Sequence, residues 1–175
     1  MLVLALLSAA TPAAAVWGPT LGGQYLKPSQ AGAKALTGWE AGLAAFGPEG
    51  QGFWHFAYGQ ARGDAGMILT TMAGRLNFSL VGRESLMIYA GPGFGYDSIK
   101  AGTKRKAWIG RVQAGILVCP VRTAQAKEDA RPNPNAPPPG PHTAGALDIG
   151  LEGGWRFGPE GFAGGDARAY LLLTI

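Results

Sequence analysis

The sequence contains few charged residues, a single cysteine and, beyond its first residues, no long apolar run. Charged residues make up 15% of the 175 positions. Because Cys119 has no second cysteine to pair with, the chain can form neither an internal disulfide nor a thiolate metal cluster. After the N-terminus, no apolar run approaches the roughly 20 residues that a membrane-spanning helix needs. These absences exclude a disulfide-stapled domain and a helical membrane protein.

Histidine is scarce as well, because His55 and His142 are the only two in the chain. Their spacing supports no two-histidine metal site. Neither is paired with a serine on an apolar strand face, as a lipid-facing hydrolase would require. We therefore expect no catalytic residue, no metal and no cofactor, and we interpret His55 as structural. The basic residues do not cluster with aromatic ones, so nucleic acid is not an expected partner despite a net charge of +4.

Glycine, by contrast, is abundant, with 29 residues. Each glycine costs a helix about 1 kcal/mol relative to alanine, so this composition disfavours long helices. Apolar and polar residues alternate along most of the chain, which is the pattern of strands with two different faces. We predict an all-β domain over residues 16–175 with eight strands, at approximately 16–27, 34–46, 52–62, 66–80, 86–98, 107–121, 142–157 and 162–175.

The segment ALDIGLEGGWRF at 146–157 shows how this alternation distributes charge. Large apolar residues occupy one parity, and Asp148, Glu152 and Arg156 occupy the other, so they point to opposite faces of the strand. Across the predicted strands the polar parity carries acids and arginines but no lysine: Glu40, Asp148, Glu152, Asp166, Arg75, Arg111, Arg156 and Arg168. A solvent-washed face would use lysine freely, whereas balanced arginine and acid suit an enclosed site of paired charges. We interpret these eight residues as a charge network in a lumen.

An enclosed polar face leaves the apolar face outside, which reverses the arrangement of a soluble barrel. A sheet that crosses lipid must close on itself, with an apolar outer surface and a polar lumen. Aromatic residues near the predicted strand ends fit the interfacial girdles of such a barrel: Trp17, Phe46, Phe53, Trp54, Phe78, Phe94, Tyr96, Trp108, Trp155, Phe157 and Phe162. The alternative is ordinary sheet packing of these rings in a soluble barrel.

Two segments differ in composition from the predicted barrel. Residues 1–15, MLVLALLSAATPAAA, resemble the apolar region and A-x-A cleavage site of a secretory signal peptide, without the basic start that normally precedes them. We interpret 1–15 as a signal peptide with a truncated start, against the alternative of a buried strand or short core helix. Residues 122–141 form a proline-rich connection that cannot lie inside a sheet.

Taken together, these features resemble the small eight-stranded outer-membrane barrels of the OmpA/OmpX type. Two local features contribute, the glycine-aromatic strand YAGPGFGY at 89–96 and an alternating last strand at 163–175. The resemblance implies an eight-stranded antiparallel up-and-down transmembrane β-barrel, a monomer in the outer membrane of a Gram-negative bacterium. It also implies that the barrel-assembly machinery reads 163–175. The family's last strand usually ends in phenylalanine, and its periplasmic turns are short. Ile175 and the long 122–141 connection depart from these two features of the family.

An eight-stranded barrel has an interior just wide enough for side chains to fill it. With the charge network and Asn77, Tyr89, Gln113 and Tyr170 pointing inward, we expect a plugged lumen. Residues 100–106, KAGTKRK, are predicted to be an outer loop. Its cations Lys100, Lys104, Arg105 and Lys106 are candidates for contact with lipopolysaccharide. The alternative is a solvated loop without a partner.

The leading functional hypothesis is a non-enzymatic outer-membrane barrel with a structural or surface-interaction role in the cell envelope, in contact with outer-membrane lipid and lipopolysaccharide. Three alternatives remain: a soluble secreted barrel that binds a small apolar ligand, a barrel enzyme that modifies lipid A, and a conducting pore. The sequence does not decide among the surface roles.

Overall fold

The computed structural model describes residues 16–30, 32–47, 51–83, 86–122, 146–159 and 161–174. The predicted signal peptide at 1–15, residues 123–141 of the proline-rich connection and the terminal Ile175 lie outside these ranges. In the described part of the chain, no helix is long and apolar enough to cross a membrane.

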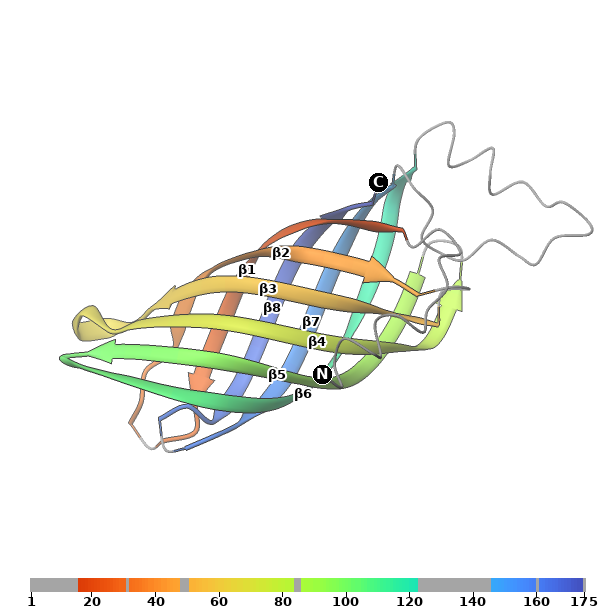
Figure 1. Ribbon diagram of the computed structural model, residues 1–175. Coiled ribbons are helices and arrows are strands. Elements are labelled where there is room, and N and C mark those ends of the chain that lie inside the picture. The colour runs from red at the N-terminus through yellow and green to blue at the C-terminus, as the bar shows by residue number, and fades with distance from the viewer. Residues whose placement is uncertain are drawn as a thin grey trace, which may run out of the picture.

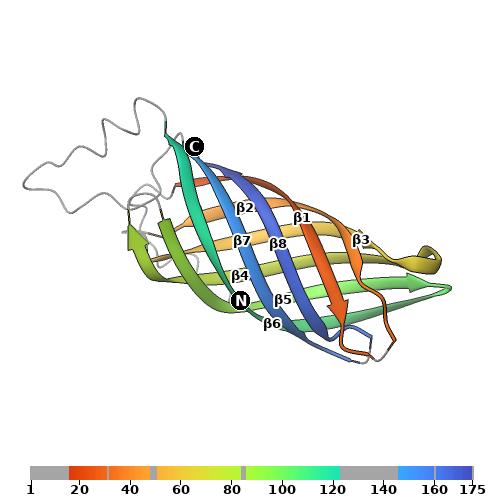
Figure 2. The same cartoon turned by 180° about the vertical axis from the view of Figure 1, so that it is seen from behind.

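Eight strands form one closed antiparallel barrel in which each strand pairs with its neighbour in the chain (Figure 1). The strands are β1 (Trp17–Pro28), β2 (Leu36–Phe46), β3 (Gly52–Arg62), β4 (Ile68–Arg83), β5 (Leu86–Ala101), β6 (Thr103–Arg122), β7 (Ala146–Phe157) and β8 (Gly164–Leu173). Figure 2 shows the wall where β1 and β8 lie side by side and close the ring. The predicted fold class and strand count are confirmed, and no strand end lies more than four residues from its predicted position.

The two ends of the barrel differ in what they carry. The start of β1, the end of β8 and the strand ends at Arg122 and Ala146 lie together at the upper right of Figure 1, which we call the terminal end. The turns of β3–β4 and β5–β6 project at the left, which we call the tip end. The β6–β7 connection therefore leaves the barrel at the terminal end, as the predicted topology requires.

The prediction of a loop at 100–106 is wrong. Strands β5 and β6 stay paired up to Ala101 and Thr103, so only Gly102 lies between them. Gly102 has φ +77, a left-handed conformation that glycine adopts without steric cost, and the chain reverses there. The four cations of this segment consequently stand on paired strands with fixed directions instead of on a loop.

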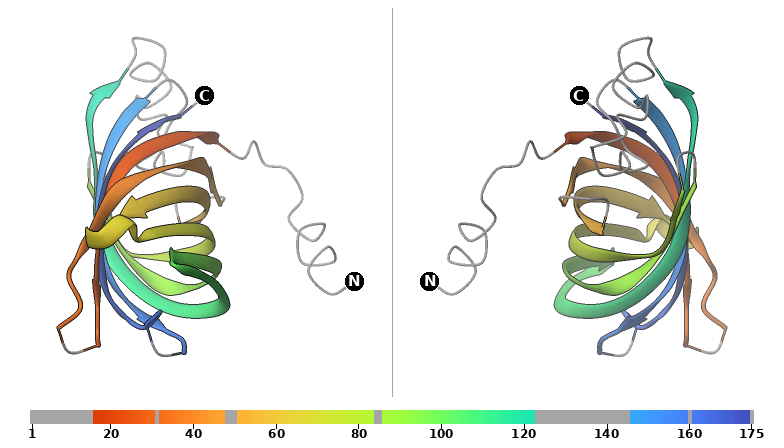
Figure 3. Two further views of the ribbon diagram at one scale, coloured as in Figure 1. Left: turned by 90° about the vertical axis from the view of Figure 1, so that its left-hand side faces the viewer. Right: turned by 90° about the vertical axis from the view of Figure 1, so that its right-hand side faces the viewer.

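The charged parity of the strands faces inward and the apolar parity faces outward. On β8, Arg168, Tyr170 and Leu172 are buried, whereas Leu171 and Leu173 are each 49% exposed. Figure 3 looks towards the two ends of the barrel and shows the strands surrounding a central space, which the inward side chains fill. The polarity is inverted relative to a water-soluble barrel, because the apolar surface is on the outside.

Three of the aromatic residues predicted for the girdles lie inside the barrel instead. Phe46, Phe53 and Phe162 are at most 4% exposed. Phe46 shares the inward parity of Glu40, and Phe53 shares that of His55, so parity could have identified both. The outward aromatic surface instead includes residues that the prediction omitted: Tyr25, Trp39, Phe56 and Tyr58.

Candidate functional site

The centre of the lumen holds a network of ion pairs. Arg75 on β4 donates from Nη1 to Oε1 of Glu40 at 3.0 Å and from Nη2 to Oε2 at 2.7 Å. Its Nε also lies 3.7 Å from Oε1 of Glu152. Such a two-pronged contact uses the planar fork of the guanidinium and fixes both side chains in orientation.

Arg168 on β8 extends this network to three carboxylates. Its Nε lies 3.1 Å from Oε2 of Glu40, its Nη1 2.5 Å from Oε1 of Glu152 and its Nη2 2.6 Å from Oδ2 of Asp166. Arg111 on β6 also pairs with Asp166. Each of these side chains is almost fully buried, so the pairs satisfy charges that would otherwise be costly to remove from water.

His55 on β3 joins the network as a neutral bridge. Arg75 Nη1 lies 2.9 Å from His55 Nδ1, and a guanidinium can only donate, so Nδ1 accepts. The proton of the neutral ring then lies on Nε2, which donates to Thr20 Oγ1 at 2.9 Å. Both ring nitrogens are occupied by these contacts, which is the structural role expected for His55.

A second ion pair joins Asp97 on β5 to Arg156 on β7. Asp97 is 1% exposed and was absent from the predicted network. The inward parity of β5 also carries Gly91, Gly93 and Gly95, which have no side chains and hid the polar face of this strand. Asp148 on β7 is fully buried as well, so all eight residues of the predicted network lie in the lumen.

Two apolar clusters cover the network. The terminal cluster lies towards the terminal end and consists of Ala44, Phe46, Phe53, Met87, Tyr89, Leu117, Tyr170 and Leu172. The tip cluster lies towards the opposite end and consists of Leu26, Leu36, Ala61 and Leu69, with Met67 and Ile99 packed against it. The lumen is therefore filled in three successive layers, apolar, ionic and apolar.

Tyr89 and Tyr170 connect the terminal cluster to the ionic layer. Their hydroxyl groups hydrogen bond to each other at 3.0 Å, and Tyr89 also donates to Oε2 of Glu152 at 3.3 Å. With Tyr89 of β5 included, the connected network takes at least one side chain from each of the eight strands. This arrangement can brace the barrel.

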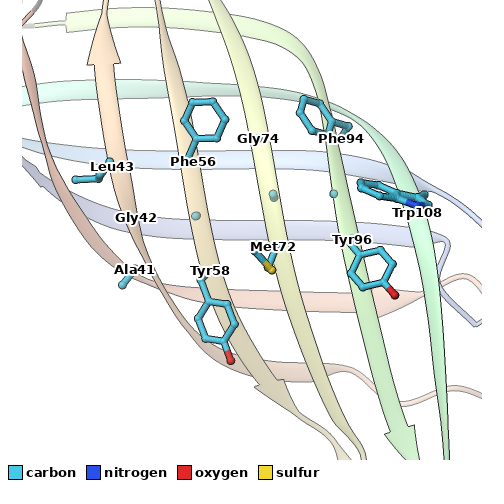
Figure 4. Close-up of a pocket in the computed structure, with 13 residues that line it drawn as sticks. Ala41, Gly42, Leu43, Phe56, Tyr58, Met72, Gly74, Phe94, Tyr96 and Trp108 are labelled. Carbon is cyan, nitrogen blue, oxygen red and sulfur yellow. The ribbon is translucent and has the colours of Figure 1, made fainter. Parts of the chain in front are cut away.

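The outer wall carries a groove whose large lining side chains point away from the lumen (Figure 4). We call it the aromatic groove; it encloses about 800 Å³ and crosses β2 to β6. Its lining residues are Ala41, Gly42, Leu43, Phe56, Ala57, Tyr58, Met72, Ala73, Gly74, Phe94, Gly95, Tyr96 and Trp108. Gly74 leaves the hollow between two rings, since a Cβ there would lie 3.1 Å from Phe94 and 3.3 Å from Phe56.

The four basic residues proposed for lipopolysaccharide contact separate into two sets. Lys100, Lys104 and Lys106 share the outward parity of Tyr96 and Trp108. Arg105 has the opposite parity, and its guanidinium carbon lies 5.7 Å from the centre of the Phe162 ring. Sequence reasoning grouped the four because it treated the segment as a loop, in which parity has no meaning.

The described residues contain no group of three histidine, cysteine, aspartate or glutamate side chains that could hold a metal ion. His142 lies outside the described ranges. The candidate site of this protein is therefore its ionic lumen together with the outer wall, and its geometry defines a closed barrel of inverted polarity.

Comparison with known proteins places the fold. No family model matches the chain, and no curated protein shows significant sequence similarity to it. Three solved structures do share the architecture at low sequence identity. Ail, the attachment invasion locus protein of Yersinia pestis, aligns with a TM-score of 0.57 and 11% identity over 92% of this chain and 99% of its own.

The N-terminal β-barrel domain of Pseudomonas aeruginosa OprF aligns with a TM-score of 0.53 and 13% identity, covering 92% of this chain and 97% of that one. Neisserial surface protein A, NspA, aligns with a TM-score of 0.52 and 10% identity, covering 92% and 96%. These matches confirm, for the fold, the resemblance to small eight-stranded outer-membrane barrels.

Proposed function

We propose that this chain is an outer-membrane β-barrel protein without a catalytic site, which braces the cell envelope or presents its tip end for surface interactions. The observation that carries the proposal is the inverted polarity: buried ion pairs inside, and half-exposed leucine, phenylalanine and tryptophan side chains outside. A surface of that kind is stable against hydrocarbon, and a closed ring leaves no backbone group unbonded in lipid.

The filled lumen favours a bracing or surface role over transport. Solutes would have to displace two apolar clusters and a network that ties all the strands together. A soluble barrel for an apolar ligand needs an apolar interior, whereas Glu40 and Arg168 occupy the centre of this one. A lipid A-modifying site would need a reactive group on the outer wall, and His55 is committed to interior bonds.

The comparisons support the surface alternative. Ail is described as an attachment invasion locus protein and NspA as a surface protein, and both share this fold. We extend the proposal to the implied assembly route, in which the barrel-assembly machinery reads the strand region 163–175. We also propose a monomer, because the eight strands close into a ring in which each strand pairs with two neighbours over most of its length.

Fractionation with a heat-modifiability assay tests the proposal. We expect the protein in the outer-membrane fraction, soluble only with detergent, and with different gel migration before and after boiling. Recovery of a folded protein in buffer without detergent would overturn it. An assay of lipid A mass with and without the protein tests the enzymatic alternative, for which we expect an unchanged profile.

A further inference from the structure

The aromatic groove continues into a set of lysines along the same two strands. Moving towards the tip end on β5 and β6, the paired Tyr96 and Trp108 are followed by Ser98 paired with Lys106, and then by Lys100 paired with Lys104. Because these positions share the outward parity, the three lysines point to the same side of the wall as the groove. We call Lys100, Lys104 and Lys106 the lysine trio.

The lysine trio is placed where its own charges oppose one another. Lys100 and Lys104 face each other directly across the hairpin, and like charges in that relation destabilise a strand pair. Of the six acidic residues in the described ranges, five are buried in the lumen, and the sixth, Asp64, pairs with Lys34. The described acids therefore leave the trio without a carboxylate on its own face of the wall.

An anion from outside the chain would relieve this repulsion, and the groove indicates what that anion is attached to. Trp108 is 72% exposed and Phe94 is 56% exposed, so a large aromatic surface begins directly beside the cations. A small soluble anion would neutralise the lysines and leave that surface uncovered. An amphiphile with an anionic head and acyl chains would neutralise the lysines and also cover the aromatic surface, because the head contacts the lysines while a chain lies along the rings.

We propose that the lysine trio and the aromatic groove together bind one anionic, phosphate-bearing membrane lipid, with its phosphate at Lys104 and Lys106 and an acyl chain in the groove. This proposal rests on the proposed membrane-spanning barrel and assigns one wall of it a specific lipid. Arg105 is excluded from the site because it faces Phe162. The neighbouring strand provides an internal reference, since Trp155 on β7 is also outward and 46% exposed but does not line the groove.

Tryptophan quenching by lipids with brominated chains tests the site in the folded protein. One variant keeps only Trp108 and a second keeps only Trp155, with phenylalanine at the other four tryptophan positions. Each is placed in phosphatidylcholine vesicles that contain increasing brominated phosphatidylglycerol, or brominated phosphatidylcholine as the reference lipid. We expect phosphatidylglycerol to be preferred at Trp108 by fivefold or more and to show no preference at Trp155.

Paired variants separate the head and chain contacts. Lys104→Gln with Lys106→Gln removes two charges from the site, and Lys27→Gln with Lys34→Gln removes two charges elsewhere at the tip end. Each cation near an anionic headgroup strengthens binding by roughly fivefold, so only the first pair should abolish the preference. Ala41→Phe fills the groove, whereas Ala169→Phe adds the same ring on the outward face of β8, and only Ala41→Phe should weaken quenching at Trp108.

The outcomes are distinguishable. If the protein inserts and is heat-modifiable but both lipids quench Trp108 equally, the lipid site is wrong and the proposed barrel stands. If inorganic phosphate abolishes the preference, the trio binds a soluble anion and the lipid site is wrong. If neither lipid quenches Trp108 while Trp155 is quenched, a protein surface covers the groove and the lipid site is wrong. Failure to insert at all overturns the proposed function itself.

Discussion

Glu40 and Arg75 form a two-pronged ion pair although the strands that carry them, β2 and β4, are not neighbours. Strand β3 lies between them, and its Gly59 is in register with Glu40. A Cβ at Gly59 would lie 3.0 Å from Cβ of Glu40 and 2.8 Å from Nε2 of Gln24. The glycine leaves room for the Glu40 carboxylate to reach Arg75 across the lumen. The ion-pair network therefore depends on the missing side chain at Gly59 as well as on the charges.

Breaking this pair on one side should destabilise the barrel more than removing both partners. We expect Arg75→Met to cost about 3–5 kcal/mol, because it leaves the buried Glu40 with fewer cations. The double variant Glu40→Leu with Arg75→Met should cost less than Arg75→Met alone, because no unpaired carboxylate then remains at Glu40. Urea unfolding in lipid vesicles, followed by gel mobility, measures all four proteins of the cycle. Additive costs would show that the two charges are not energetically coupled.

The eight strands and the eight lumen charges were predicted from two-residue periodicity. This periodicity is visible in the sequence wherever both faces of a strand carry side chains. The prediction from sequence failed in three places for identifiable reasons. Between Tyr89 and Asp97 the inward face of β5 carries only glycines, so no alternation marked that carboxylate. Phe46 and Phe53 were assigned by their closeness to strand ends instead of by their parity with Glu40 and His55.

The third failure concerns how elements end. The concentration of cations between Lys100 and Lys106 was interpreted as a loop, but Gly102 alone supplies the reversal. The two apolar clusters and the aromatic groove could not be predicted, because each joins strands that are distant in sequence. Contacts across the barrel, such as the one between Tyr89 and Tyr170, are set by how the barrel closes and by the strand register. Neither the closure nor the register can be obtained from the sequence alone.

The layered lumen predicts an electrically silent protein. In planar bilayers we expect a flat current trace for the unmodified protein. Because the three layers lie in series, thinning the tip cluster with Leu36→Ala and Leu69→Ala should leave the trace flat, since the ionic layer and the terminal cluster still block the path. Stepwise openings in either protein would show that the layers do not seal the lumen.

The outward apolar wall predicts a depth-dependent penalty for charge. Leu151, 49% exposed, lies in the middle of β7 and pairs with Ile116 and Ala169. Leu151→Arg should cost about 2–4 kcal/mol, as arginine does near the centre of a bilayer. Thr37→Arg, near the tip end of β2, should cost about 0–1 kcal/mol. Equilibrium unfolding from vesicles compares them, and equal small costs would argue that water, not lipid, covers β7.

The turn region at the tip end contains one ion pair with a measurable titration. The Lys34 ammonium hydrogen bonds to the Asp64 carboxylate, and that bond and the opposite charge raise the pKa of Lys34 above its ordinary value of 10.5. A raised pKa in the folded state means that the pair stabilises the turn at neutral pH and loses its effect as pH rises through that pKa. NMR titration of the Lys34 side chain should show a lower pKa in Asp64→Asn and a retained shift in Asp64→Glu. Identical curves in all three proteins would contradict the pairing.

Two glycines of β7 give a test of how tightly the lumen is packed. Gly150 faces inward beneath Tyr170, and a Cβ there would lie 2.2 Å from Cζ of that ring. The ring is held by its bond to Tyr89, so Gly150→Ala should displace it and cost about 1–3 kcal/mol, as overpacking of a filled interior does. Gly153 faces outward, and a Cβ there has its nearest neighbour at 3.9 Å.

Gly153→Ala is therefore the matched control, with the same substitution on the same strand and an expected change within about 0.5 kcal/mol. Packing alone also predicts coupling, because Tyr170→Leu removes the ring that the new methyl group strikes. In the Gly150→Ala background, Tyr170→Leu should cost less than it does in the unmodified protein. Unfolding midpoints in vesicles measure the cost of Tyr170→Leu in the unmodified protein and in the Gly150→Ala background. If Gly150→Ala and Gly153→Ala are equally tolerated, Tyr170 has room to move, and the lumen is a looser assembly than its ion pairs and ring contacts describe.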